Sequence, residues 1–131
     1  MLKHNAQHFS GRTMRGEGIA TTTTGYPTLN LDRRTLQGTL PKRGLWSCWA
    51  SLHGKRYPAT LIIGVPYQRK KRKHGKVEVH ILGTVKVRAG TRVEVHLVDW
   101  IRALIPYTTV EALQKQIAKD LRTARHQLKL K

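Results

Sequence analysis

Polar and apolar residues alternate in two segments of the C-terminal half of the chain. Residues 76–82 read Lys-Val-Glu-Val-His-Ile-Leu, and residues 92–98 read Arg-Val-Glu-Val-His-Leu-Val. Successive side chains of a β-strand point to opposite faces of its sheet, so this pattern predicts two strands that each bury one face.

A β-hairpin is predicted ahead of these two segments. Residues 45–52 are aromatic and apolar, the sequence His53-Gly54-Lys55 is typical of a turn, and residues 56–63 form the returning strand. Pro58 has no backbone N–H, which predicts an edge position or a bulge there. Residues 8–15 are a further strand candidate, and short strands joined by turns favour an antiparallel sheet or a closed barrel.

A helical period occurs only near the C-terminus. Thr108-x-x-Glu111 matches a capping box, which predicts the start of a helix. The apolar residues that follow form one stripe: Val110, Leu113, Ile117, Leu121, Ala124 and Leu128. We expect one domain over residues 1–131, with a barrel at about 8–105 and one helix at about 109–127.

The charge balance is extreme, with 25 Lys and Arg against 7 Asp and Glu and a formal net charge of +18. A field of this sign attracts polyanions such as nucleotides, nucleic acids and anionic lipid surfaces. The densest basic run is Arg69-Lys70-Lys71-Arg72-Lys73. It is either a solvated loop or a site that steers ATP or docks on RNA.

Three further features bound the location of the protein. The chain has no run of about 18 apolar residues, and its first residues lack the apolar stretch of a signal peptide. Cys48 is the one cysteine, so an internal disulfide cannot form, which is consistent with a reducing compartment. We expect a cytoplasmic monomer without a membrane span. The histidines show no metal-ligand spacing, so no zinc is expected.

The most distinctive stretch is rich in glycine and threonine. Gly16 and Gly18 precede four consecutive threonines at 21–24. Glycines let backbone N–H groups approach an anion closely, which predicts a phosphate cradle. The stretch ends in Pro-Thr-x-Asn, and the oxygens of Thr28 and Asn30 are hard ligands of the kind that Mg²⁺ takes. The alternatives are a flexible solvated loop and a turn whose side chains cap local backbone.

Four segments, taken in order, match one known family. The first is Gly25-Tyr26-Pro27-Thr28-Leu29-Asn30, and the second joins Gly44-Leu45-Trp46 to residues 56–66. The third is residues 77–82, and the fourth runs from Val93 through Ile101-Arg102, Tyr107 and residues 109–113 to Asp120. These segments resemble the riboflavin kinase family, whose motif Gly-Φ-Pro-Thr-Ala-Asn is similar to the first segment. The resemblance spans about residues 8–127.

The resemblance implies a mostly β fold: a six-stranded antiparallel barrel with Greek-key connections and one C-terminal α-helix. It also implies an enzyme that transfers the γ-phosphoryl group of ATP, with Mg²⁺, to the 5′-hydroxyl of riboflavin, giving FMN and ADP. The chain begins too close to the barrel to include a nucleotidyltransferase domain, so we expect FMN synthesis alone.

Glu78 is the expected catalytic residue. By the resemblance it is the general base towards the 5′-hydroxyl, and a carboxylate within about 2.6–3.2 Å of that group accepts its proton. Thr28 and Asn30 hold Mg²⁺ together with the nucleotide phosphates by the same resemblance. The pattern alone leaves an alternative, in which Glu78 faces outwards and pairs with Lys73 or Lys76.

The resemblance assigns Gly16, Gly18 and Thr22 to a flap over the nucleotide phosphates. Family members usually carry Arg or Lys in this flap, whereas this chain has Ile-Ala-Thr-Thr-Thr-Thr at 19–24. Hydroxyl groups bind phosphate oxygens but supply no positive charge. The candidates that compensate for this difference are Arg12, Arg15 and Lys76.

Arg102 and Tyr107 fall where the family contacts the flavin. A guanidinium plane and an aromatic ring both suit contact with an isoalloxazine. The Pro-Glu that often follows the arginine in the family is replaced here by Ala-Leu. For Tyr107, packing at the start of the helix is an equal alternative. We expect the three tryptophans in the core or at the barrel rim.

The charge and the uncharged flap leave an alternative of a different class. It is a basic RNA- or ribosome-binding protein built on a repurposed barrel of this family. The four segments favour the small-molecule substrates, ATP and riboflavin, over this alternative.

Overall fold

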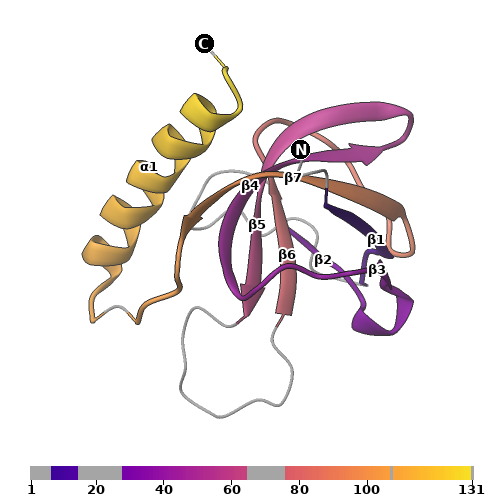
Figure 1. The fold of residues 1–131 in the computed structure, drawn as a ribbon, viewed down its shortest axis with the longest axis horizontal. Coiled ribbons are helices and arrows are strands. Elements are labelled where there is room, and N and C mark those ends of the chain that lie inside the picture. The colour runs from indigo at the N-terminus through magenta and orange to yellow at the C-terminus, as the bar shows by residue number, and fades with distance from the viewer. Residues whose placement is uncertain (1–6, 15–27, 65–75, 107, 131) are drawn as a thin grey trace.

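The described part of the molecule is a curled antiparallel β-sheet with one α-helix alongside it (Figure 1). The structure is a computed structural model and describes residues 7–14, 28–64, 76–106 and 108–130. This architecture confirms the predicted mostly β class with a C-terminal helix. In the described residues, no helix has both the length and the apolar character that crossing a membrane requires.

Seven strands form the sheet, in the order β2-β6-β5-β4-β7-β1-β3. They are β1 (His8–Arg12), β2 (Thr28–Asn30), β3 (Gln37–Gly38), β4 (Gly44–Leu52), β5 (Lys55–Gly64), β6 (Lys76–Ile81) and β7 (Arg92–Arg102). The predicted number of six is wrong by one, because the exposed two-residue strand β3 pairs with β1 and has no apolar pattern of its own. Strands β4, β5 and β6 are consecutive neighbours and β7 returns beside β4, which is a Greek-key connection.

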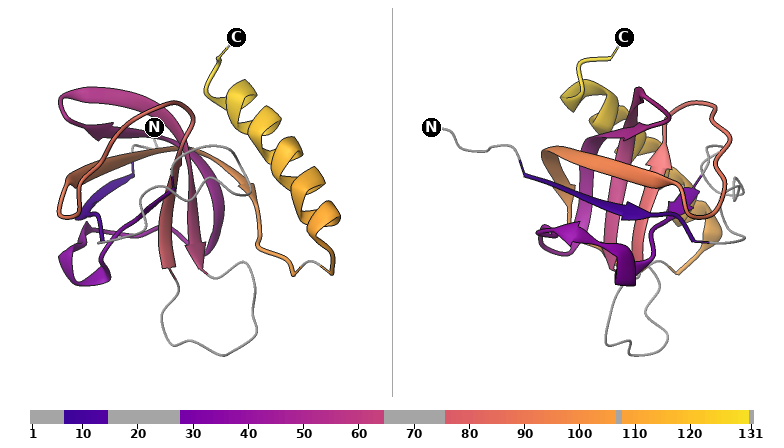
Figure 2. Two further views of the ribbon diagram at one scale, coloured as in Figure 1. Left: turned by 180° about the vertical axis from the view of Figure 1, so that it is seen from behind. Right: turned by 90° about the vertical axis from the view of Figure 1, so that its right-hand side faces the viewer.

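Backbone contacts join the segment after β1, near one side of the sheet, to the segment after β2, at the other side. Thr13, which follows β1, forms an antiparallel bridge with Leu31, which follows β2. Next to this bridge, Met14 N donates a hydrogen bond to Asn30 O at 2.8 Å. The sheet therefore curls far enough to enclose a core, as the views from two further sides show (Figure 2).

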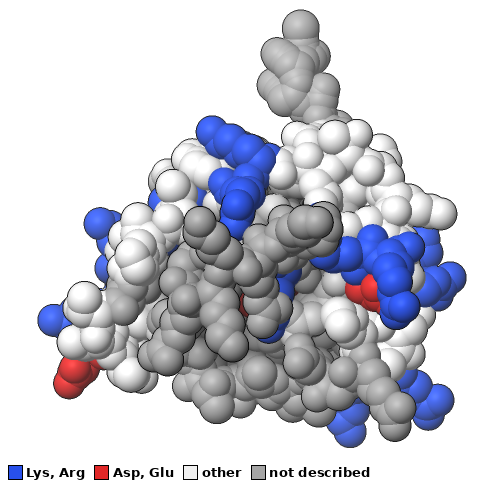
Figure 3. Space-filling view, turned by 90° about the horizontal axis from the view of Figure 1, so that it is seen from below, with Lys and Arg blue, Asp and Glu red and all other residues white. Residues whose placement is uncertain are grey.

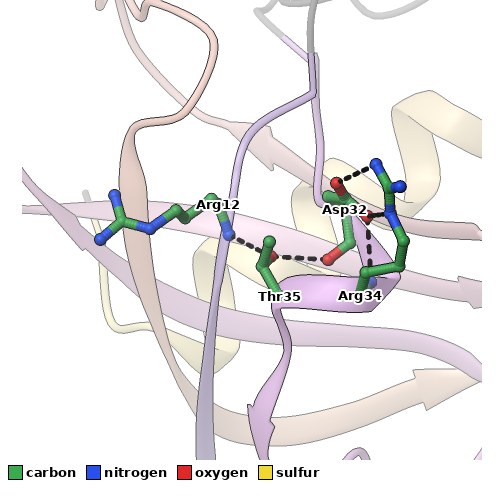
Figure 4. Close-up of polar contacts among 4 residues, drawn as sticks. All are labelled: Arg12, Asp32, Arg34 and Thr35. Atoms are coloured by element: carbon green, nitrogen blue, oxygen red, sulfur yellow. Dashed lines mark hydrogen bonds and ion pairs between the residues drawn. The ribbon is translucent and has the colours of Figure 1, made fainter.

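A short 3-10 helix, η1 (Arg33–Thr35), ties this junction together (Figure 4). Thr35 Oγ1 accepts a hydrogen bond from Arg12 N at 2.8 Å and donates one to Asp32 O at 2.7 Å. The Asp32 carboxylate accepts hydrogen bonds from the backbone and the guanidinium of Arg34. These bonds hold the pKa of Asp32 below its usual value, because they favour the charged carboxylate.

The hydrophobic core lies inside the curl. Its largest fully buried side chains come from strands on both halves of the sheet and include Phe9, Leu29, Leu61, Ile81 and Val93. On β6 the alternation is regular: Val77, Val79 and Ile81 are buried, and the residues between them are only partly covered. Glu78 and His80 consequently lie on the face of β6 that points away from the core.

Strand β7 is longer than the alternation predicts. The pattern ends at Val98, whereas the strand continues to Arg102 through two register shifts against β4. Such β-bulges insert an extra residue and so break the two-residue period on which the prediction rests.

Pro58, expected at an edge position or a bulge, lies in an interior strand at the point where one neighbouring strand has ended. It lies in β5, between β4 and β6, opposite Trp49. Strand β6 ends at Ile81, opposite Ala59, and Leu82 N donates to the Pro58 carbonyl at 2.8 Å. The missing N–H therefore falls where the neighbouring strand has ended.

The helix α1 (Val110–Gln127) begins one residue later than the predicted capping box. Thr109 is the N-cap, and its hydroxyl accepts a hydrogen bond from Ala112 N at 3.0 Å. Val110 was predicted in the apolar stripe but is 67% exposed, because it lies in the first turn, before the helix meets the sheet. Ala124 and Leu128 are buried as predicted.

The tryptophans pack against apolar clusters or against each other, as predicted. Trp46 packs against the core and meets Trp100 edge to face at 5.1 Å between ring centroids. Trp49 packs against a second apolar cluster, which Leu82 forms with the helix residues Ala124 and Leu128.

Candidate functional site

Glu78 sits on the outer face of β6 and is nevertheless well covered. Its side chain is 16% exposed, so it does not face bulk solvent. In the strand register Asn30 of β2 lies opposite it on one side and Ile62 of β5 on the other. The imidazole of His80 lies beside the Glu78 carboxylate.

The structure brings the predicted catalytic and magnesium residues onto one surface. Asn30 is opposite Glu78, and Thr28 is opposite His80. Residues directly opposite each other in an antiparallel pair share a face, with Cβ atoms about 4.5–5.5 Å apart. We call these four residues the β2–β6 patch. Thr28 and Asn30 are buried, although both point away from the core.

His80 has no role in the prediction from sequence, yet it connects the other members of the patch. Its Nδ1 lies 3.3 Å from Thr28 Oγ1, and its Nε2 lies 3.5 Å from Glu78 Oε1. The imidazole thus spans from the hydroxyl on β2 to the carboxylate on β6. The spacing Glu-x-His predicts that Glu78 and His80 lie on the same side of the strand, because residues two apart on a strand share a face.

The donor atoms of the β2–β6 patch fit Mg²⁺. Thr28 offers a hydroxyl oxygen, Asn30 an amide oxygen that is buried, and Glu78 a carboxylate. All three are hard oxygen ligands, the type this ion prefers. Within the described residues no group of three or more His, Cys, Asp or Glu is placed to hold a metal ion.

Arg102, predicted to contact the flavin, joins the end of β7 to the helix. Its Nε and Nη2 donate to the two carboxylate oxygens of Asp120 at 2.9 and 2.7 Å. Gln116 Nε2 also donates to Asp120, at 2.9 Å. Asp120 is buried on the inner face of α1, where an acidic residue needs such partners. An acid within the apolar half of a helix is the sequence feature that points to this ion pair.

A second polar contact holds the C-terminal part of α1 on the sheet. Ser47 of β4 is fully buried and donates to Gln127 Oε1 at 2.6 Å. The amide nitrogen of Gln127 donates to Trp100 O at 3.0 Å. Neither Ser47 nor Gln127 has a role in the prediction from sequence.

Glu78 and Arg102 lie in one row across the outer face of the sheet. The register connects Glu78 with Ile62, Ile62 with Leu45, and Leu45 with Arg102. Neighbouring strands are about 4.8 Å apart, so the row separates Glu78 from Arg102 by about 14 Å along the sheet. The patch and the arginine therefore mark the two ends of one surface, which the helix borders.

The remaining predicted site residues, Gly16, Gly18, Thr22 and Tyr107, lie outside the described residues, and so does the basic run 69–73. The roles assigned to them stay predictions.

One family model matches nearly the whole chain. The chain matches the family model described as riboflavin kinase over residues 3–128. No match was found among curated proteins.

Two solved structures share the fold. A macrolide-efflux protein from Streptococcus pneumoniae matches with a TM-score of 0.70 and 23% identity. The match covers 90% of the present chain but only 36% of the efflux protein. Riboflavin kinase from Trypanosoma brucei matches with a TM-score of 0.63 and 19% identity over 96% of this chain and 82% of that one.

Substitution Asp120→Ala is expected to lower the free energy of unfolding by about 3 kcal/mol, because it leaves the Arg102 guanidinium without its buried carboxylate partner. Urea denaturation followed by tryptophan fluorescence measures the loss. The control Glu94→Ala breaks the pair between Glu94 and Arg92. The Arg92 side chain is 52% exposed and that of Glu94 36%, so this change is expected to lower the free energy of unfolding by at most about 1 kcal/mol. Equal losses in the two variants would contradict the role given to Asp120.

Proposed function

Because the chain belongs to the riboflavin kinase family, we propose that it transfers the γ-phosphoryl group of ATP to the 5′-hydroxyl of riboflavin, giving FMN and ADP. The observation that carries the proposal is the β2–β6 patch, where Thr28 and Asn30 meet Glu78 on one covered surface. The shared fold with the riboflavin kinase of T. brucei supports it.

Glu78 is the proposed general base. It accepts the proton of the 5′-hydroxyl as that oxygen bonds to the γ-phosphorus, and the bond from this phosphorus to the departing ADP oxygen breaks. Phosphoryl transfer needs little covalent chemistry from a protein, so the placement of the groups matters most. The low exposure of Glu78 limits the water that would compete with riboflavin for the phosphoryl group.

Thr28 and Asn30 are the residues that would hold Mg²⁺ beside the nucleotide phosphates. When bound, the ion offsets the negative charge of the phosphates. Gly16, Gly18 and Thr22 are the proposed flap over the nucleotide. His80 is a positioning residue in this scheme, since it contacts both Thr28 and Glu78.

Arg102 and Tyr107 are proposed for the flavin end of the site. The ion pair with Asp120 holds the Arg102 guanidinium in one plane, and a fixed plane suits stacking on a flat ring system. In this proposal the sugar-alcohol end of riboflavin binds at the patch and its ring binds near the helix, and the row from Glu78 to Arg102 supports this orientation.

A cytoplasmic monomer that acts on small molecules fits this proposal. Cys48 is a free thiol inside the core, and burial raises its pKa, which keeps it in the unreactive protonated form.

The purified protein is expected to convert riboflavin and Mg-ATP to equal amounts of FMN and ADP, with loss of activity when EDTA removes the metal. Separation of the flavins by chromatography measures the product. Parallel reactions with CTP, GTP and UTP identify the preferred nucleotide, because the flap sequence 19–24 has no cation to select it. Absence of FMN with all four nucleotides would refute the proposal.

The variant Glu78→Gln keeps the shape of the side chain and removes the base. We expect kcat to fall by about 10²–10⁴-fold with little change in KM for riboflavin, because proton transfer occurs in the chemical step. Glu94→Gln makes the same change on β7 and is the control, with unchanged turnover expected. Wild-type kcat in Glu78→Gln would remove Glu78 from the mechanism.

Two variants of His80 separate its contacts. The amide of His80→Gln reaches towards the Nε2 position and keeps a group beside Glu78, whereas that of His80→Asn mimics Nδ1 and keeps the contact with Thr28 only. We expect His80→Asn to lower kcat by about tenfold and His80→Gln to lower it less, with KM for riboflavin near that of the wild type in both. The reverse order, or a fall in stability that accounts for the loss, would contradict a positioning role.

A further inference from the structure

Helix α1 presents a basic stripe to solvent. Lys115, Lys119, Arg122, His126 and Lys129 recur every three or four residues, and all five are exposed. At 100° per residue the four that belong to the helix, Lys115, Lys119, Arg122 and His126, lie within about 60° of one another around the helix axis, and a rise of 1.5 Å per residue makes their line about 17 Å long. Lys129 follows just beyond the end of the helix at Gln127. We call these five residues the α1 stripe.

The two acidic residues of α1 lie outside the stripe. Asp120 points to the sheet and is paired with Arg102. Glu111 lies in the first turn, at the N-terminal end of the stripe. The contacts between basic and acidic side chains of described residues do not involve the stripe: they are Arg34–Asp32, His80–Glu78, Arg92–Glu94 and Arg102–Asp120.

The C-terminal end of the stripe has an unusual residue. Lys129 has a φ of 60°, in the left-handed region where glycine is preferred after a helix. Lys129 N donates to His126 O at 3.0 Å and Leu130 N to Arg125 O at 2.8 Å, which is a Schellman motif. The helix dipole favours cations in the last turn, but this effect does not extend to Lys115 and Lys119, which lie before the last turn.

We propose that the α1 stripe binds the phosphate backbone of a double-stranded nucleic acid, a function beyond the proposed kinase activity. Its cations follow one another at about 4.5–6 Å along the axis, which suits an extended polyanion better than a single small anion. Residues 110–130 contain no Phe, Tyr or Trp on which the bases of a single strand would stack. The exposed apolar residue beside the stripe is Ala118. The described helix therefore presents no large apolar side chain on this side that would insert into a lipid layer.

The stripe lies on the side of the helix away from the sheet, whereas the β2–β6 patch lies on the sheet itself. The two sites therefore do not overlap. Lys and Arg residues are spread over several parts of the face seen from below (Figure 3). Because the net charge of +18 would attract a polyanion to many places, a test has to distinguish the stripe from the overall charge.

The test compares two triple variants that each lower the net charge of +18 by three. One is Lys115→Gln, Lys119→Gln and Arg122→Gln in the stripe. The other, the matched control, is Lys55→Gln, Lys86→Gln and Arg88→Gln, three exposed residues away from α1. Fluorescence anisotropy follows binding to an RNA duplex of about 20 base pairs, and to a DNA duplex of the same sequence, at about 50–300 mM salt.

The stripe variant is expected to bind both duplexes on the order of 10²-fold more weakly than the wild type at about 0.1 M salt. Its plot of log K against log salt should be less steep by about 2.7, since each lost phosphate contact removes about 0.9 from the slope. The control is expected to keep the wild-type slope.

Equal losses in the two triple variants would overturn the proposal, because net charge would then explain the binding. Binding to vesicles that contain phosphatidylserine, without binding to either duplex, would overturn it in favour of a lipid surface. Thermal unfolding checks that each variant is folded. Should the stripe variant unfold early, the single variants Lys119→Gln and Arg122→Gln replace it, each with an expected slope change of about 0.9.

Discussion

The two-residue period of β6 is the constraint on which the candidate site depends. Burial of Val77 and Val79 in the core forces Glu78 and His80 onto the outer face, and a slip of one residue would exchange the two sets. The pairing of β2 with β6 then places Asn30 beside Glu78. The hydrophobic core therefore positions the polar site, although no residue of the patch belongs to it.

The helix is oriented by a few polar contacts as well as by apolar packing. Apolar side chains accept several rotations of a helix, whereas the two-pronged bond between Arg102 and Asp120 requires one direction of approach. Ser47 and Gln127 make a second polar contact at the C-terminal end of α1. The same rotation that turns Asp120 inwards turns the basic stripe outwards, so one set of contacts shapes both the surface around Arg102 and the opposite side of the helix.

Local pattern was sufficient for the elements whose periodicity is uninterrupted. Residues 76–82 and most of α1 follow from their spacing alone, because one buried face repeats along them. The bulges of β7 and the two-residue strand β3 could not be predicted in this way. They result from pairing with a strand that is distant in the sequence, and the local pattern does not show them. The first helical residue was misplaced by one because Thr108 and Thr109 are both capable caps, and only the backbone path selects Thr109.

By itself, the amino-acid sequence determined the mostly β class, the C-terminal helix and the residue types able to carry phosphoryl-transfer chemistry, since these depend on local periodicity and on the chemistry of side chains. Only the tertiary structure decided which of those residues meet. Thr28 and His80 are 52 positions apart in the chain and 3.3 Å apart in space between their polar atoms. Strand register sets such contacts, and register is decided by the packing of the whole sheet.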